Sequence, residues 1–148
     1  MLGKVSTVQT KFIEDFFENY LLAFKSFEVE KLVGYYCLPC ALNTPEQIVL
    51  LTSIEECNVE ISKIFKQLQQ EKTNEIHVER ASYSQVTDKI IFVNVDWKFV
   101  NEQGEVFANF CAIYHLVEIS SQLKIINVVS HEITNSLTLD TPLKLRNK

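Results

Sequence analysis

Two cysteines separated by two residues, Cys37 and Cys40, form a motif that carries redox chemistry in other proteins. In a redox centre the pair opens a helix, whose N-terminal amides lower the pKa of the first thiol. Here the pair follows a predicted helix and enters a predicted strand, and a helix C-terminus would raise that pKa instead. We therefore expect small, reduced, buried thiols and keep redox chemistry as the alternative.

Three histidines and the cysteines are the side chains that could bind a soft or borderline metal. His115 and His131 are predicted on the same sheet face as Cys111 and Asn127. This group could hold a metal, but hydrogen bonding across a subunit interface is favoured. We predict no metal and no cofactor, since the sequence shows no P-loop, dinucleotide glycine fingerprint or serine nucleophile elbow.

The stretch from Lys89 to His131 predicts three consecutive antiparallel strands that would position these groups. A hairpin closes at Gly104, which can take a positive φ, and residues 120–122 make the second turn. Pairing Val100 with Glu105 places Trp97 opposite Ala108. It also sets out an apolar face, which carries these residues: Ile91, Val93, Val95, Trp97, Ala108, Phe110, Ala112, Tyr114, Leu116, Ile126 and Val128.

The opposite face of these strands mixes polar and apolar residues, among them Asn94, Asp96 and His115. It is too apolar for bare solvent and too polar for a core, which is the composition of a subunit interface. The composition of this outward face therefore predicts a homodimer that packs through it.

Helical patterns precede the strands. A helix over 7–25 carries an apolar stripe at every fourth residue, made of Val8, Phe12, Phe16, Tyr20 and Phe24 and widened by Ile13, Phe17 and Leu21. A short helix follows up to Gly34. Short strands over 37–43 and 47–52 lead to a helix over 53–70 that begins with a Ser53–Glu56 capping box, and a strand spans 75–86. This order predicts an α+β fold with helices covering one sheet face.

Composition limits the class of protein. A formal charge of -5 argues against nucleic acid or an anionic membrane as the main partner, and ten Phe and five Tyr suggest a wide aromatic interior. No apolar leader or membrane span is present, so we expect a cytoplasmic protein. We expect one domain over 1–148, with a core over about 7–132 and a loosely packed C-terminal tail over 133–148.

The chain resembles the nuclear transport factor 2-like superfamily, to which SnoaL-like cyclases, ketosteroid isomerases and scytalone dehydratase belong. The likeness covers about residues 12–131, and it rests on Phe16–Tyr20, Val29–Tyr36, Val95–Phe99, Gly104 and Lys124–His131. The resemblance implies a curved mixed or antiparallel sheet wrapped around helices, a cone with a deep pocket, and often a homodimer. Within that cone, the expected pocket-lining and ligand-binding residues are Tyr20, Tyr36, Arg80, Trp97, Tyr114 and Ser130.

An apolar pocket with several hydroxyls and one cation suits a small, partly apolar molecule, anions included. A one-residue shift in the strand of Arg80 would put His77 and Glu79 inside instead. The resemblance implies two carboxylates for a ketosteroid isomerase, but Cys37, Cys40 and small or aromatic residues stand in those regions. We therefore expect small-molecule binding with no assigned catalysis. The alternatives are a cyclase, isomerase or dehydratase using a tyrosine with Asp96 or His77, and a protein-interaction module using the outward face.

Overall fold

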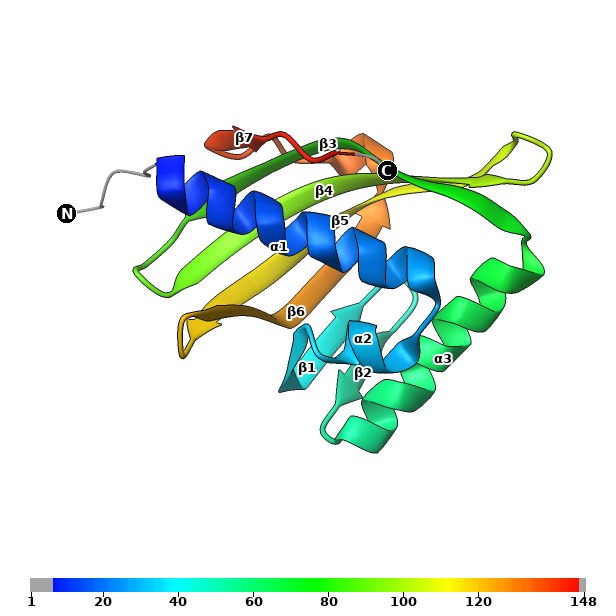
Figure 1. Cartoon of the computed structure of the whole chain (residues 1–148), viewed down its shortest axis with the longest axis horizontal. Coiled ribbons are helices and arrows are strands. Elements are labelled where there is room, and N and C mark those ends of the chain that lie inside the picture. The colour runs from blue at the N-terminus through cyan, green and yellow to red at the C-terminus, as the bar shows by residue number, and fades with distance from the viewer. Residues whose placement is uncertain (1–6, 147–148) are drawn as a thin grey trace.

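The structure, a computed structural model, describes residues 7–146, so the first six and last two residues of the expected domain lie outside it. It is an α+β fold, as expected, with a curved and unclosed seven-stranded sheet (Figure 1). The strands lie in the order β2-β1-β6-β5-β4-β3-β7, and only β1 and β6 pair in parallel. The elements are α1 (Thr7–Ser26), α2 (Val29–Val33), β1 (Tyr36–Asn43), β2 (Ile48–Leu51), α3 (Ile54–Gln70), β3 (Thr73–Gln85), β4 (Ile90–Asn101), β5 (Val106–Ile119), β6 (Gln122–Glu132), the 3-10 turn η1 (Ile133–Asn135) and β7 (Thr141–Leu143).

Helix α1 crosses the concave face of the sheet (Figure 1). Its most buried side chains are Ile13, Phe17, Tyr20 and Leu21, all of which belong to the predicted apolar face. Ser53 caps the N-terminus of helix α3, and its hydroxyl accepts from the Glu56 amide as the capping box predicts. The Glu56 carboxylate accepts from the amide of Thr52, one residue earlier than the motif requires.

The β4–β5 hairpin confirms which residues face the core but corrects their partners. Trp97 pairs with Phe110 and not with Ala108, a shift of two residues along β5. The side chain of Asn101 accepts from the amides of Gln103 and Glu105 in the turn. Next to the turn the pairing contains a bulge, because Val100 pairs with Val106 whereas Phe99 pairs with Ala108. Because side chains alternate with a period of two, a two-residue shift leaves both faces unchanged.

A second irregularity, between His115 and Leu116, changes one inward residue of β6. Ile125 pairs with Leu116 and is fully buried, whereas the sequence had predicted Ile126 on the inner face. The extra residue of a bulge advances the alternation by one position.

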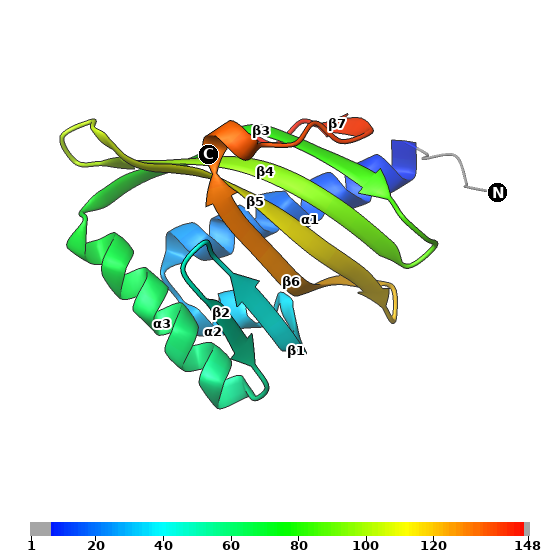
Figure 2. The same cartoon turned by 180° about the vertical axis from the view of Figure 1, so that it is seen from behind.

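The C-terminal segment over 133–146, which we expected to pack loosely, makes specific contacts with the sheet and with α1. It crosses the outer face of β4 and β3, where the Leu137 and Leu139 amides donate to Asn94 and Ser82 (Figure 2). It then adds β7 to the edge of β3 and reaches α1, where Arg146 pairs with Glu18 at 2.7 Å. This segment therefore wraps the sheet edge and ties it to the helix.

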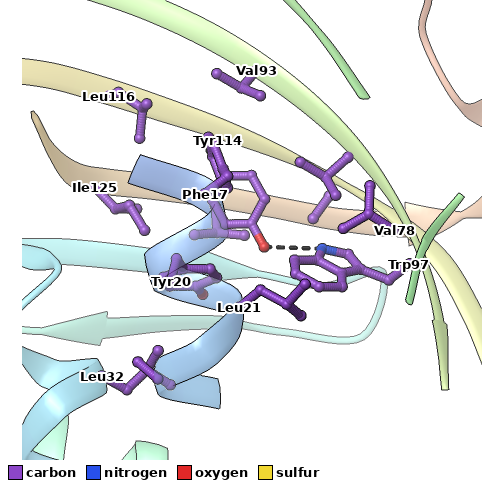
Figure 3. Close-up of a cluster of buried hydrophobic side chains, with 14 of the residues drawn as sticks. Phe17, Tyr20, Leu21, Leu32, Val78, Val93, Trp97, Tyr114, Leu116 and Ile125 are labelled. Carbon is purple, nitrogen blue, oxygen red and sulfur yellow. Dashed lines mark hydrogen bonds between the residues drawn. The ribbon is translucent and has the colours of Figure 1, made fainter. Parts of the chain in front are cut away.

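Replacing the core indole tests the face assignment. Trp97 is 3% exposed and packs against α1 (Figure 3), so Trp97→Ala should lower the free energy of unfolding by about 3 to 5 kcal/mol. Urea titration measures this change. Leu22→Ala, at a side chain that is 52% exposed on α1, is the control and should change it by less than about 0.5 kcal/mol. Equal losses in both variants would contradict the assignment.

The wrapping segment supplies a polar contact that can be tested in the same way. Ser136 donates to the Asp96 carboxylate at 2.6 Å, and Asp96 is 7% exposed. Ser136→Ala removes a partner from a buried carboxylate and should cost about 1 to 3 kcal/mol in urea unfolding. Thr138 is exposed, and its hydroxyl bonds, within residues 7–146, only to the half-exposed Arg80, so Thr138→Ala should have little effect. A negligible cost for Ser136→Ala would show that the segment does not hold Asp96.

Candidate functional site

A cavity of about 580 Å³ opens between α1, α3 and the inner face of the sheet. Aromatic and aliphatic side chains, together with Ser130, make its wall, and polar residues of α3 and the β1–β2 hairpin make its rim. The wall consists of Tyr20, Phe24, Tyr36, Leu42, Val49, Ile64, Trp97, Phe99, Phe110, Tyr114, Val128 and Ser130. The rim consists of Asn43, Thr44, Gln47, Glu60, Lys63 and Gln67.

Five of the six predicted pocket residues come together around this cavity. Tyr20 comes from α1, Tyr36 from the start of β1, Trp97 from β4, Tyr114 from β5 and Ser130 from β6. Whether they bind a ligand stays a prediction. The rim could not be predicted from the sequence, because the apolar stripe of α3 predicts only which residues of that helix face the core. Its polar residues carry no local pattern that assigns them to a cavity.

Arg80 does not line the cavity. A bulge between Val78 and Arg80 lets Val78 pair with the inward Trp97 and Arg80 pair with the outward Asp96. The Arg80 Nε lies 3.2 Å from the Asp96 carboxylate, and the side chain of Arg80 is half exposed. The extra residue at Glu79 rotates the rest of the strand by one position, which an unbroken alternation could not predict.

The proposed acids and bases of the enzyme alternative also lie outside the cavity. Asp96 is on the outer face, as predicted, and is covered there by Ser136. His77 precedes the inward Val78 and pairs with Lys98, so it too points outward. Among the described residues, the carboxylate and amine that line the cavity belong to Glu60 and Lys63, which lie 3.9 Å apart at the rim.

The aromatic wall holds a cluster of buried hydroxyls. The Tyr20 and Tyr36 hydroxyls are 2.7 Å apart, and the Trp97 indole donates to the Tyr114 hydroxyl at 3.0 Å (Figure 3). The Tyr20 and Tyr114 rings meet edge to face with centroids 5.8 Å apart. Burial raises the pKa of Tyr20, Tyr36 and Tyr114 well above the ordinary value. All three therefore stay protonated near neutral pH and can donate hydrogen bonds.

The two cysteines of the C-x-x-C motif have different surroundings. Cys40 is 1% exposed, and burial raises its pKa to about 12, whereas Cys37 is partly exposed. All four cysteines are free thiols. On the outer face, the Cys111 sulfur lies 3.2 Å from Nδ1 of His131, but the described residues contain no cluster of three or more groups suited to a metal.

Thiol alkylation tests this difference in burial. Since the thiolate is the reactive form, iodoacetamide at pH 8 should modify Cys37 in the native protein and leave Cys40 unmodified over the same period. Mass spectrometry of peptides gives the site. All four thiols should react in denaturant, which is the control, and rapid native labelling of Cys40 would contradict the buried placement.

The geometry defines a class of protein: an α+β cone with a curved sheet, helices over its concave face and a cavity between them. The family described as "NTF2-like protein (DUF6841)" matches residues 9–133, so the chain belongs to this NTF2-like family. The resemblance inferred from the sequence is thereby confirmed. No curated protein matches the chain.

Solved structures share the fold at low sequence identity. A domain of unknown function with a cystatin-like fold from Nostoc punctiforme has a TM-score of 0.70 and 16% identity, covering 90% of this chain and 81% of that one. An NTF-2 like protein of unknown function from Shewanella oneidensis has a TM-score of 0.68 and 11% identity, covering 83% and 98%. A ketosteroid isomerase-like protein from Erwinia carotovora atroseptica has a TM-score of 0.64 and 15% identity, covering 86% and 98%.

Within the described residues, no helix is long and apolar enough to cross a membrane.

Proposed function

We propose that this protein binds a small, largely apolar molecule in the cavity between α1, α3 and the sheet. The observation that carries the proposal is a space of about 580 Å³ with an aromatic wall and a polar rim. Small-molecule sites commonly measure about 300 to 1,000 Å³ and combine apolar walls with a few placed polar groups. The Tyr20–Tyr36 and Trp97–Tyr114 hydrogen bonds supply such groups.

Catalysis is the second candidate, favoured by the fold shared with a ketosteroid isomerase-like protein. In this chain a proton transfer would fall to Glu60 or Lys63, which pair at the rim, or to a tyrosine whose pKa is raised by burial. A general base near neutral pH needs a lower pKa than such a tyrosine has. Binding without catalysis therefore accounts for more of the site.

Trp97, the one tryptophan of the chain, lines the cavity and can report binding. We expect 1-anilinonaphthalene-8-sulfonate to bind the folded protein and to receive excitation energy from Trp97. Ile64→Phe adds bulk inside the cavity and should weaken that binding by about tenfold, because the larger ring occupies ligand volume. Fluorescence titration measures both affinities.

The matched control is Val59→Phe, which places the same ring on the same helix at a side chain that is 56% exposed. It should leave the affinity unchanged. Circular dichroism establishes that both variants stay folded. Equal binding by Ile64→Phe and Val59→Phe would place the dye elsewhere and count against the cavity.

We also propose that the uncovered part of the outer sheet face packs against a second copy of this chain. The wrapping segment covers β3 and the middle of β4, whereas Leu50 of β2 and Phe92 near the start of β4 stay 61% and 39% exposed. Ile113 and Val129 pair directly on the same face. Nε2 of His115 is a buried atom with no hydrogen-bond partner among the described residues. These side chains carry no formal charge when His115 is neutral, and burial lowers the pKa of His115.

Sedimentation equilibrium tests the homodimer. The wild-type protein should sediment as a dimer, and Ile113→Lys should shift it to monomer because a desolvated ammonium would face its own copy. Leu22→Lys places the same charge on an exposed position of α1 and should leave the dimer intact. A monomeric wild-type protein would reject the dimer and favour a different protein as the partner of this face.

A further inference from the structure

One buried nitrogen on the outer face of the sheet has no hydrogen-bond partner among the described residues. It is Nε2 of His115, on β5. The ring of His115 meets that of Phe92 edge to face, with centroids 5.0 Å apart, and Asn127 pairs with His115 on β6. The His115 side chain is partly exposed, so the chain encloses one nitrogen while part of the ring still reaches the surface.

The protonation state of the ring determines the cost of this enclosed nitrogen. A neutral imidazole carries one proton, and Nδ1 can hold it, which leaves Nε2 as an acceptor. An imidazolium carries a proton on both nitrogens, and its Nε2 hydrogen would then be buried without an acceptor. Burying an unsatisfied charged donor costs more than burying an unsatisfied neutral acceptor. The enclosed nitrogen of His115 therefore favours the neutral ring.

Within the described part of the chain, no free carboxylate lies beside His115. The outward residues of β5 from Cys111 to Val117 have these partners on β4 and β6: Ile90, Phe92, Asn94, Asp96, Lys124, Asn127, Val129 and His131. Asp96 is the one carboxylate in that set, and it already pairs with Arg80. It lies opposite Cys111, four residues from His115, which is about 13 Å along a strand. Asp96 is therefore too far away to stabilise a protonated ring.

The other titratable groups around His115 supply no negative charge either. Lys124 and His131 are cationic or neutral, and burial raises the pKa of Cys111, which keeps its thiol neutral. Glu118, on β5 itself, pairs with Lys89 at 3.7 Å. A protonated His115 would thus carry an uncompensated charge on an apolar face.

His115 lies within the part of the outer face that we propose packs against a second copy. Phe92 and Ile113 are its apolar neighbours there. Packing removes the remaining water from the partly exposed ring, and a charged ring loses more hydration free energy than a neutral one. We infer that protonation of His115 weakens the association of the two copies, so that the dimer formed at neutral pH dissociates under mildly acidic conditions. This inference rests on the proposed homodimer.

The size of the effect follows from the number of histidines involved. Each copy contributes one His115, and an imidazole with the ordinary pKa of about 6.5 is about nine-tenths protonated at pH 5.5. Two copies therefore raise the dissociation constant by at most about a hundredfold. Burial already lowers the pKa of His115 in the single chain, which reduces this ceiling. We expect a rise of about tenfold between pH 7.5 and pH 5.5.

Sedimentation equilibrium at the two pH values measures both dissociation constants. His115→Gln and His115→Phe place side chains that do not titrate at this position, one polar and one apolar. Each variant should have the same dissociation constant at both pH values. His131→Gln is the matched control, because it removes a second histidine from the same outer face, and it should keep the tenfold response.

A second measurement uses the wild-type protein alone. Because proton binding and association are linked, raising the protein concentration should move the midpoint of the His115 titration to lower pH. The chain has three histidines, and NMR follows the ring signal of each. The signal missing from His115→Phe identifies His115. The midpoint of His77, which lies on β3, should not depend on concentration.

The outcomes separate this inference from the homodimer itself. A wild-type protein that is monomeric at both pH values would reject the homodimer and the inference together. A dimer with one dissociation constant at both pH values, and a His115 midpoint that concentration does not move, would overturn the inference and leave the homodimer. A response that persists in both His115 variants and disappears in His131→Gln would also overturn it, because the response would then belong to His131.

Discussion

The buried hydroxyl of Tyr20 is the constraint on which the arrangement around the cavity depends. Tyr20 stands on α1 with its ring among those of Tyr35, Trp97 and Tyr114, where a polar atom must find a hydrogen bond or lose stability. Its partner, Tyr36, lies at the start of β1, beyond α2. The 2.7 Å contact therefore joins the first helix to the strand that closes one side of the cone, and it does so at the cavity wall.

Bulges decide which side chains enter that wall. Each of the three irregularities described for β3, β4–β5 and β5–β6 adds a residue and bends the sheet locally. The bulge near Glu79 places the Arg80 side chain on the outer face. The bulge near His115 places Ile125, and not Ile126, on the inner face. As a result the tyrosine wall holds no described cation, and its chemistry is that of neutral donors.

The outer face of the sheet is divided between intramolecular cover and open surface. The segment over 133–146 covers Ser82, Asn94 and Asp96, which are all buried polar residues on that face. Such residues need hydrogen-bond partners once water is excluded, and the segment supplies them from Ser136 and backbone amides. Over β5 and β6 the outer face carries apolar residues that this segment does not cover. The covered part therefore needs hydrogen-bond partners, whereas the uncovered part suits an apolar surface.

The sequence by itself determined the fold class, the three main helices, the strands from β1 to β6 and which face of β4 and β5 is buried. Hydrophobic periodicity carries that information, because burial of one face is a property of each element alone. It also named Tyr20, Tyr36, Trp97, Tyr114 and Ser130, which the structure gathers around one cavity. Only the tertiary structure decided the register of the hairpin, the outward place of Arg80, the rim from α3 and the course of the last residues. These features depend on bulges and on contacts between distant segments, such as Ser136 with Asp96, which leave no local pattern in the chain.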